Sequence, residues 1–545
     1  MTRAPLDGAP VTRGHRGRAR LVVVGDALLD RDLEGRAGRL APDAPVPVVD
    51  DPAERRRAGG AALAATLAAR LDGRAVVLIT ALAADEAGAA LRELLELAGV
   101  EVVDLGLSGS TPEKVRVRAD GQSLVRLDRA TRPGRVGPLG PAGRRALAGA
   151  GAVLVADYGR GLAAEPGVRA VLAGLPSRRP MIWDPHPRGP APVPGARLAT
   201  PNRAEAAGFA PEVEGDGLTA MTTRARLLAE RWGAAGVAVT LGARGALLVE
   251  GAGAPLVIPA TPARGGDPCG AGDRFATTAA GLLADGALPS EAVAGAVTAA
   301  TAFVTAGGAG MIDLEAGATP RPEASAIAHL EPRATAHLGP GAPPTLGAPH
   351  PHPPVPGAPG WEGNPQPEQA RTVVHSPPTH TLPPRSPDGG DPLDRALALI
   401  AGVRARGGTV VATGGCFDLL HAGHVATLRA ARALGDCLVV CLNSDGSVRR
   451  LKGLERPLVP QADRVAVLEA LGCVDAVVPF DERTPEAVLQ RLRPDVFAKG
   501  GDYALAHLPE AALLATWGGQ AVILPYLEGR STTQLMKEVV RRDSH

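Results

Sequence analysis

The sequence predicts two successive α/β domains joined by a long linker. Short β-branched runs alternate with Ala/Leu-rich helical patterns on both sides of the linker, as in layered α/β folds. Between them, residues from about 339 to 392 consist mostly of Pro, Gly, His and Thr, which cannot bury enough apolar surface to offset the entropy of ordering. Each side also carries its own phosphate-type motif. We expect a disordered segment 1–17, a first domain 18–325, a linker 326–391 and a second domain 392–545.

Composition narrows the class of protein. A chain of 545 residues exceeds the usual size of a single core, and its net charge of +1 gives no global field for nucleic acid or a membrane surface. No apolar run approaches the roughly 18 residues of a membrane span, and the first one, LVVVG, is too short for a signal peptide. The five cysteines lack paired CxxC spacing, which favours reduced thiols in the cytoplasm over a structural zinc site.

The first domain opens with a buried strand at residues 21–24 that ends in Gly25-Asp26. Carboxylates just after such a strand lie at the usual ligand edge of an open α/β sheet. Asp26 and Asp30 are therefore candidates for binding sugar hydroxyls, with turn capping as the alternative.

Two segments do not fit a parallel sheet. Residues 46–49 read as a strand bearing prolines, which belongs at an edge or in a lid. Residues 114–129 read as a hairpin with an Asp120-Gly121 turn. We expect these segments to form a small β lid. Gly59 and Gly60 then open an Ala/Leu helix, where paired glycines allow a ligand to approach the backbone.

The strongest signal in the first domain is GGDPCGAGDRFATTAAGLL, residues 265–283. Gly270, Ala271 and Gly272 begin a long helix, so their N–H groups would form an anion hole supported by the helix dipole. Asp273 follows at once, and a carboxylate beside an anion hole needs a chemical reason. Catalysis supplies such a reason, because Asp273 could act as the base that deprotonates an attacking hydroxyl while the N–H groups hold a phosphoryl group. The alternative is a simple helix cap.

These motifs resemble those of ribokinase-like (PfkB) sugar kinases over residues 18–325. Gly59-Gly60, the Asn202-x-x-Glu205 motif, the TLGxxG motif and Gly270-Ala-Gly-Asp273 occur in that family's order. The resemblance implies a three-layer α/β domain with a β lid, often paired as a homodimer. It implies that Asp273 is the catalytic base and that Gly59 and Gly60 lie at the sugar. It further implies that Asn202 and Glu205 organise Mg²⁺ and phosphates, and that Thr240 and Gly242 lie near the nucleotide.

The stretches VVVGDALLDRDLEG, RLAPDAPVPVV and ADYGRG are more narrowly similar to the heptose 7-phosphate kinase branch. Three departures from the kinase pattern involve four residues. Leu63 stands where the family usually has a sugar-contacting Asn, and His186 stands where the branch usually has Lys. Pro268 and Cys269 replace small or hydroxyl residues in the loop before Gly270. These changes leave the identity of the sugar open.

The second domain begins with an amphipathic helix at 391–407, followed by strand, glycine loop, helix and strand. His421 and His424 flank Gly423 where the loop becomes the helix. Two imidazoles at this spacing can stabilise charge on an α-phosphate as pyrophosphate leaves. The alternatives are a pair of histidines on a helix face or a zinc site with Cys416 and Asp418.

This domain resembles the HxGH nucleotidyltransferases over residues 395–540, and within them the heptose 1-phosphate adenylyltransferase branch, through GGCFDLLHAGHV, LNSDGSVRRLKG, RPLVPQADRVAVL, VFAKGGDY and GRSTTQLMKEV. The resemblance implies a Rossmann-like fold, with His421 and His424 on the phosphates and Lys452 and Arg464 as cationic partners. The remaining nucleotide and phosphate positions that it implies are Gly415, Phe417, Asp418, Lys499, Gly500, Asp502, Ser531, Thr532 and Thr533. The Ser-Thr-Thr run precedes a helix, so it suits phosphate in either family.

The order of the two domains is that of the bifunctional enzyme of ADP-heptose biosynthesis. The resemblance implies phosphorylation of D-glycero-β-D-manno-heptose 7-phosphate at O1 by ATP, and adenylyl transfer from ATP to heptose 1-phosphate, with Mg²⁺ bound through the ATP phosphates. A separate phosphatase must remove the 7-phosphate between the steps, and a flexible linker of about fifty residues with a reach of roughly 40 Å leaves room for it. The alternatives are a different sugar phosphate, or one domain that only binds.

Overall fold

The structure is a computed structural model that describes residues 18–119, 122–261, 265–312, 391–500 and 509–524. The expected disordered N-terminus, almost all of the linker and the Asp120-Gly121 turn lie outside these residues. The two predicted domains are described separately below.

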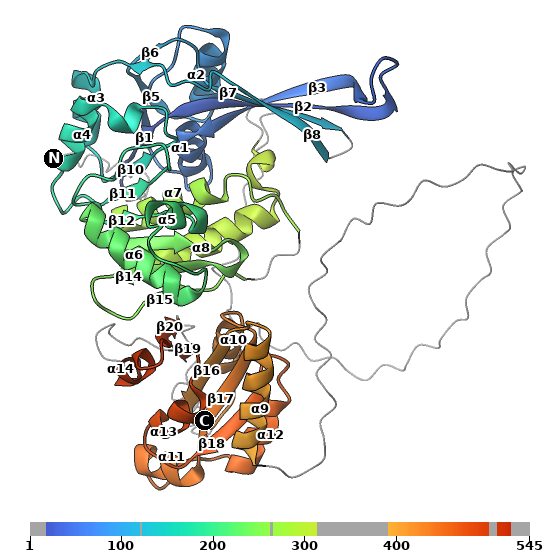
Figure 1. The fold of residues 1–545 in the computed structure, drawn as a ribbon. Helices are drawn as coiled ribbons and strands as arrows, with labels where there is room; N and C mark the ends of the chain where they lie inside the picture. Colours follow the sequence, from blue (N-terminus) through green and yellow to red (C-terminus); the bar gives the residue numbers. More distant parts are fainter. Residues whose placement is uncertain (1–17, 120–121, 262–264, 313–390, 501–508, 525–545) are drawn as a thin grey trace, which may run out of the picture. The chain divides into compact units, whose positions relative to one another are not determined.

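The N-terminal domain is built on a mainly parallel sheet (Figure 1). Its strand order is β15-β14-β13-β12-β11-β10-β1-β4-β5, and β14 alone runs opposite to the other strands, antiparallel to both β13 and β15. The strands are β1 (Leu21–Gly25), β4 (Val76–Thr80), β5 (Glu101–Asp104), β10 (Ala152–Ala156), β11 (Met181–Asp184), β12 (Leu198–Ala199), β13 (Gly236–Thr240), β14 (Ala246–Glu250) and β15 (Leu256–Ile258). The predicted β-α alternation is confirmed.

Helices cover both faces of this sheet, which explains why its central strands are apolar throughout. In β1, Leu21 and Val23 pack into one core while Val22 and Val24 pack into another. The first face is covered by α1 (Ala61–Arg70), α2 (Glu86–Leu97), α7 (Ala271–Ala284) and α8 (Pro289–Thr305). The second is covered by α3 (Pro141–Ala148) and α4 (Pro166–Ala173), while α5 (Arg203–Phe209) and α6 (Leu218–Trp232) pack beside β13. Short 3-10 turns are η1 (Leu162–Ala164), η2 (Gly242–Arg244) and η3 (Gly308–Met311).

The predicted β lid is a separate four-stranded sheet of order β3-β2-β7-β8, which projects from the domain in Figure 1. It consists of β2 (Ala27–Leu40), β3 (Pro47–Gly60), β7 (Glu113–Ala119) and β8 (Gln122–Arg129), and a short pair, β6 (Leu107–Ser108) and β9 (Arg135–Val136), lies apart from it. The lid is larger than predicted, because β2 was not expected as a strand. Its outer half is charged and exposed, so it lacks the apolar alternation that predicts strands.

The C-terminal domain has an all-parallel sheet of order β18-β17-β16-β19-β20. Its strands are β16 (Val410–Gly415), β17 (Cys437–Asn443), β18 (Ala476–Phe480), β19 (Val496–Gly500) and β20 (Gln520–Leu524). Its helices are α9 (Pro392–Ala405), α10 (Ala422–Arg432), α11 (Asp445–Lys452), α12 (Gln461–Glu469), α13 (Glu486–Leu492) and α14 (Pro509–Ala515). The α9 helix packs on one face of the sheet and α10 on the other, so the predicted Rossmann-like layering is confirmed.

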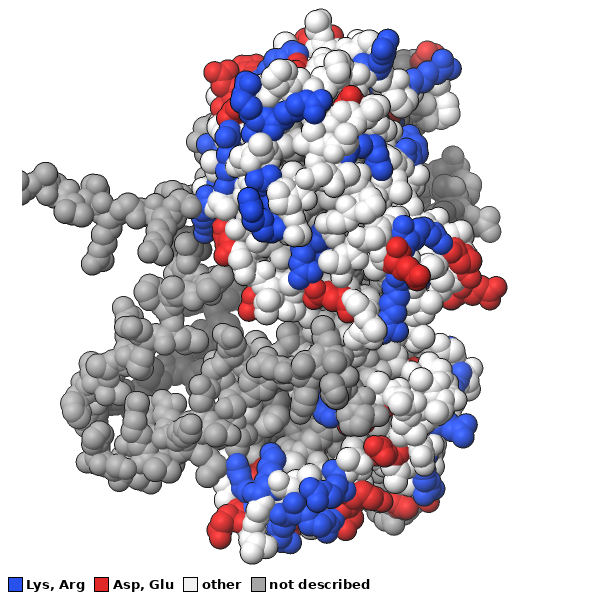
Figure 2. Space-filling view, turned by 90° about the vertical axis from the view of Figure 1, so that its left-hand side faces the viewer, with Lys and Arg blue, Asp and Glu red and all other residues white. Residues whose placement is uncertain are grey.

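Surface charge is mixed. Figure 2 shows one face, on which Lys and Arg side chains are interspersed with Asp and Glu over broad uncharged areas. Among the described residues, no helix has the length and apolarity needed to cross a bilayer.

Candidate active sites

The N-terminal site centres on Asp273 at the start of α7. Gly270 caps the helix with φ of 80°, a left-handed conformation that glycine adopts without strain. Asp273 is the third residue of the helix and is 8% exposed. Tyr158 Oη donates a hydrogen bond to Asp273 Oδ1 over 2.6 Å. Burial raises the pKa of Asp273 to about 6, so the carboxylate is a stronger base than an exposed aspartate.

The predicted anion hole is only partly available for a ligand. Ala271 N–H donates to Pro268 O over 3.0 Å, so this group closes a turn. Among the described residues, the N–H groups of Gly270 and Gly272 have no backbone acceptor. The first turn of α7 therefore offers these two donors, beside Asp273, to an anion.

Asp26 lies at the expected sheet edge but organises a loop. Its carboxylate accepts hydrogen bonds from the N–H groups of Tyr158, Arg160 and Leu162 at 3.3, 2.9 and 3.0 Å. The side chain is buried, and these bonds fix the loop that follows β10. In this structure Asp26 thus positions Tyr158. The sugar contact expected for Asp26 stays a prediction.

Asp30 lies at the base of the lid. Its Oδ1 is ion-paired with the Arg116 guanidinium at 2.8 Å. The β2–β3 register places Gly59 opposite Leu28 and Gly60 opposite Ala27, and a Cβ added to Gly59 would lie 2.5 Å from Asp30 Oδ2. The predicted sugar-binding positions are therefore brought together, and only glycine leaves room for this carboxylate.

The Asn202 and Glu205 side chains form a reciprocal capping box on α5. Asn202 Oδ1 accepts from Glu205 N at 2.9 Å, and Glu205 Oε2 accepts from Asn202 N at 2.8 Å. Thr240, at the end of β13, bridges to Asn202 through the backbone, and Gly242 turns the chain just beyond it. The predicted nucleotide-region residues therefore meet at neighbouring strand ends.

Sequence reasoning missed three polar residues of this site: Lys114, Tyr158 and Asp184. Lys114 Nζ lies 5.7 Å from the centroid of the Tyr158 ring. Asp184 Oδ1 accepts from Thr200 Oγ1 at 2.7 Å, and burial raises its pKa well above the usual range. Tyr158 and Asp184 lie at the carboxyl ends of β10 and β11, the same signal that singled out Asp26.

Two of the departures from the kinase pattern have a structural meaning. Leu63 is buried in α1 and packs beside Gly270, since a Cβ added to that glycine would lie 3.0 Å from Leu63 Cδ2. An apolar side chain thus stands beside the anion hole. His186 lies in the loop after β11, where its Nδ1 accepts from Arg188 N at 3.1 Å.

The C-terminal site contains the two predicted histidines. His421 caps α10, and its Nδ1 accepts from Gly423 N at 3.1 Å, so the neutral ring carries its proton on Nε2. The His421 and His424 rings are stacked with centroids 4.0 Å apart, and Phe417 lies 5.3 Å from His424. Burial and the neighbouring His421 lower the pKa of His424 to about 4. Both imidazoles therefore lie together at the helix start, as predicted.

Two predicted phosphate residues organise loops. Asp418 accepts from Arg456 Nη1 at 2.5 Å and from the N–H groups of Leu458 and Val459 at 2.6 and 3.0 Å. Arg464 is buried, and its guanidinium donates to the carbonyls of Val459, Cys416 and Asn443 and to Asp445 Oδ1. Arg464 therefore has a structural role, and its contact with a phosphate stays a prediction.

The other described positions lie at the carboxyl ends of β16 and β19, except Lys452, which ends α11. Gly415 ends β16 beside Phe417, since an added Cβ would lie 3.1 Å from that ring. Lys499 pairs with Glu510 at 2.9 Å. Gly500 lies against Thr427 of α10. Asp502, Ser531, Thr532 and Thr533 lie outside the described residues.

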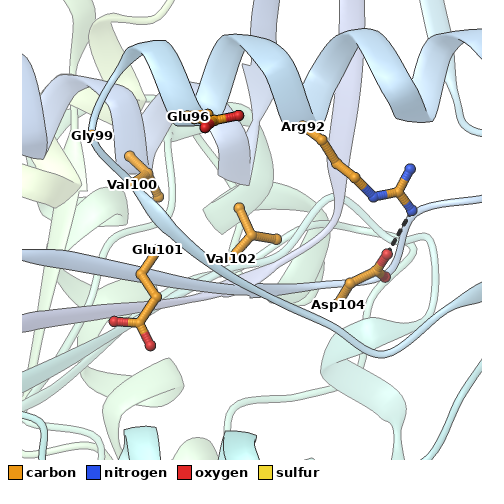
Figure 3. Close-up of a pocket in the computed structure, with 7 residues that line it drawn as sticks. All are labelled: Arg92, Glu96, Gly99, Val100, Glu101, Val102 and Asp104. Carbon is orange, nitrogen blue, oxygen red and sulfur yellow. Dashed lines mark hydrogen bonds and ion pairs between the residues drawn. The ribbon is translucent and has the colours of Figure 1, made fainter.

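A separate surface depression of about 420 Å³ lies between α2 and β5 (Figure 3). Arg92 of α2 reaches across to Asp104 of β5 and forms an ion pair at 2.7 Å. None of the predicted site residues lines it, so we assign it no catalytic role.

Comparison with known proteins supports the two predicted domain families. The pfkB carbohydrate kinase family matches residues 176–316, and the cytidylyltransferase-like family matches residues 412–532. A solved ribokinase from Arabidopsis thaliana, complexed with ribose and ATP, is 22% identical with a TM-score of 0.43, and covers 54% of this chain and 95% of its own. Fold, motifs and family matches together define a two-domain enzyme with a carbohydrate kinase and a nucleotidyltransferase activity.

Full-length relatives identify the family. The bifunctional protein HldE of Streptomyces coelicolor is 54% identical over 521 residues, which is 95% of this chain and 96% of that protein. HldE of Azorhizobium caulinodans is 35% identical over 529 residues, covering 95% and 98%. This chain belongs to the bifunctional HldE family.

Proposed function

We propose that the enzyme carries out two ATP-dependent steps of ADP-heptose synthesis. The N-terminal domain phosphorylates D-glycero-β-D-manno-heptose 7-phosphate at O1 and gives the 1,7-bisphosphate. The C-terminal domain joins AMP from ATP to heptose 1-phosphate and gives ADP-heptose and pyrophosphate. The observation that carries this proposal is the pairing, on one chain, of a buried base at a helix N-terminus with a histidine pair at a second one.

In the kinase step, Asp273 takes the proton from the anomeric hydroxyl. The freed O1 electron pair forms the bond to the γ-phosphorus of ATP, and the bond from that phosphorus to the β,γ-bridging oxygen breaks, so that ADP leaves. The N–H groups of Gly270 and Gly272, which have no backbone acceptor among the described residues, would stabilise charge on the transferring group. Tyr158 orients the Asp273 carboxylate through its hydrogen bond to Oδ1.

In the transfer step, an oxygen of the sugar 1-phosphate forms a bond to the α-phosphorus of ATP. The bond from the α-phosphorus to the α,β-bridging oxygen breaks, and pyrophosphate leaves with that electron pair. His421 presents an Nε2–H donor, because its Nδ1 is occupied by the Gly423 N–H. His424 stacks on it and can gain a proton as phosphate charge approaches.

ATP serves both steps as a substrate, and Mg²⁺ would neutralise charge on its phosphates when bound. In the kinase domain, Glu205 is the described residue best suited to meet that ion. Only its Oε2 takes part in the capping box, and burial raises its pKa, a cost that a nearby cation would relieve.

Product analysis by mass spectrometry tests the proposal. With heptose 7-phosphate, ATP and Mg²⁺, we expect the 1,7-bisphosphate alone. Adding a bisphosphate phosphatase should yield ADP-heptose and pyrophosphate. Strong turnover of a hexose phosphate, with none of heptose 7-phosphate, would contradict the proposed substrate.

A kinase–nucleotidyltransferase for another sugar phosphate is the second candidate. Leu63 beside the anion hole and His186 after β11 favour it, because Leu63 replaces an Asn expected to contact the sugar and His186 replaces a Lys. Coupled assays across sugar phosphates separate the two candidates.

We further propose the domain limits 18–325 and 392–545, a cytoplasmic location, and a separate phosphatase acting between the two steps. A homodimer through the lid is supported by β8, where Leu124, Val125 and Leu127 are 39–47% exposed. Sedimentation of the protein with and without a Leu127→Lys substitution tests the dimer. A wild-type monomer would contradict it.

A further inference from the structure

The carboxyl group of Asp157 is a buried titratable group that neither proposed reaction uses. Asp157 follows β10 directly, is 4% exposed, and precedes Tyr158, the residue that donates to Asp273. Its Oδ1 accepts from Gly159 N at 2.7 Å. Its Oδ2 is buried without a hydrogen-bond partner, and among the described residues neither oxygen takes part in an ion pair. Unpartnered buried oxygens of this kind are rare in native structures.

Asp157 joins the loop after β10 to the loop after β11. Its N–H donates to Asp184 O at 3.1 Å, at the end of β11. Its Oδ2 lies against Gly189, since a Cβ added to that glycine would lie 1.7 Å from this oxygen. Gly189 N in turn donates to His186 O at 2.8 Å. The carboxyl group is therefore enclosed between the two loops, and a side chain at position 189 would displace it.

Charged and titratable side chains surround this carboxyl group. They are Asp26 after β1, Tyr158 and Arg160 on the same loop as Asp157, Asp184 at the end of β11, His186 and Arg188 beyond it, and Arg169 of α4. The charge of Arg169 acts on Asp157, but its Nη1 donates to Ala191 O at 3.1 Å. The nearby cations therefore do not form an ion pair with Asp157.

The geometry favours the neutral acid of Asp157 over the carboxylate. Asp26 accepts from three N–H groups through its two oxygens, so a negative charge is well stabilised there. Asp157 has one N–H donor, and a second negative charge beside Asp26 in a buried site would be costly. Burial is the main cause, and the charge of Asp26 a smaller one, that raises the pKa of Asp157 to about 7.

We propose that Asp157 is a positioning residue of the kinase site that works as a neutral acid, holding the loops after β10 and β11 together so that Tyr158 reaches Asp273. This rests on the proposed function, in which Asp273 is the kinase base. An ionised Oδ2 needs water or a donor, and its contact with Gly189 leaves room for neither, so ionisation separates the loops. The kinase then loses the Tyr158 contact at alkaline pH, while adenylyl transfer is unaffected.

Asp157→Asn tests the proposal, because the amide has the shape of the neutral acid and cannot ionise. The kinase kcat/KM of the wild type should fall above about pH 7, by up to about tenfold per pH unit. In Asp157→Asn it should stay level up to about pH 9. Gly189→Ala, which displaces the carboxyl group, should lower the kinase kcat at every pH. The rate of adenylyl transfer in each sample corrects for effects outside the kinase site.

Asp104→Asn is the matched control, because Asp104 pairs with Arg92 on β5, at the edge of the sheet. Its kinase profile should keep the alkaline fall of the wild type. The same fall in Asp157→Asn, or a wild-type profile that stays level from about pH 7 to 9, would overturn the proposal.

Hydrogen exchange followed by mass spectrometry examines the loops without any substrate. The N–H groups of Gly159 and Gly189 are hydrogen-bonded in the closed arrangement. Above about pH 7, peptides that contain them should exchange faster in the wild type than the chemical rate alone predicts, and not in Asp157→Asn. If the enzyme uses another sugar phosphate, the heptose assignment fails while this result stands. Equal protection of both proteins at every pH would refute the role of Asp157 even where the kinase function holds.

Discussion

Tyr158 Oη and Asp273 Oδ1 are joined by a hydrogen bond of 2.6 Å that links the loop after β10 to the first turn of α7. The phenol is partly buried, and its desolvation and the charge of Asp273 raise its own pKa, so it stays protonated as the donor. A donor of this kind stabilises the ionised carboxylate and opposes the effect of burial. Asp26 holds the same loop through three N–H groups and so sets the position of this donor.

The kcat/KM of the kinase reaction should therefore fall at low pH as Asp273 becomes protonated. With a pKa of about 6, raised from the usual value, the base is ionised above pH 6 and protonated below it. The kcat/KM should fall about tenfold per pH unit below that midpoint. The substrate phosphate also titrates near pH 6, so one profile alone does not identify the enzyme group.

Tyr158→Phe resolves this ambiguity. Loss of the donor should raise the pKa of Asp273 and move the acid limb about one pH unit upward, while the substrate titration stays fixed. Rates are measured from pH 5 to 9 for both proteins, with adenylyl transfer as the internal control. An unchanged midpoint of the acid limb, with a rate lowered equally at every pH, would mean that Tyr158 contributes packing and does not tune the pKa of Asp273.

The two activities should be separable by single substitutions. Asp273→Asn keeps the size of the side chain but removes the base, so kinase turnover should fall at least about a hundredfold. His424→Ala removes the imidazole that we propose contacts the phosphates and should reduce adenylyl transfer by a similar factor. Each reaction is followed by product formation in both variants. A kinase rate unaffected by Asp273→Asn would refute the assigned base.

The layers of the fold were predictable because central strands such as β1 and β17 are apolar on both faces, and glycine-containing turns mark where they end. The extent of the lid was not predictable, since β8 and the outer half of β2 are exposed and are held by pairing in a small sheet. In such segments the β propensity of the residues predicts a strand only weakly, because pairing with the partner strand decides whether the strand forms.

The motif residues of the sites were also predictable, but their partners were not. Asp273, His421 and His424 follow from glycine-containing helix starts. Tyr158 reaches Asp273 across 115 positions of the chain, and no local pattern encodes such a contact. The four acceptors that the fold supplies to the Arg464 guanidinium could not be predicted either, because they come from separate segments of the chain.

This role of Arg464 predicts a loss of stability. Arg464→Met would leave three carbonyls and Asp445 without their donor, which should destabilise the C-terminal domain by about 3–5 kcal/mol. Urea denaturation measures this loss of stability, with the rate of adenylyl transfer as the probe of the folded C-terminal domain. Arg449→Met, an exposed arginine on α11, should change stability by about 0.5 kcal/mol or less. Wild-type stability with weakened ATP binding would instead support a phosphate contact.

The lowered pKa of His424 predicts a proton uptake coupled to nucleotide binding. With a pKa of about 4, below the usual value, His424 is neutral at pH 7 in the free enzyme. The folded state then binds fewer protons than the unfolded state between about pH 4 and 6.5, so stability should fall as the pH drops through that range. A triphosphate beside the ring should raise the pKa, because a nearby anion favours the charged imidazole.

Histidine-labelled NMR titration measures the pKa of His424 directly. We expect a midpoint below pH 5 in the free enzyme and a higher one with a non-hydrolysable ATP analogue. Lys452→Met should raise the free-enzyme midpoint, because the positive charge of Lys452 contributes to lowering it. Arg449→Met is again the control, with no change expected. A midpoint near pH 6.5 that is the same with and without the ATP analogue would show that His424 is solvated and does not contact the phosphates.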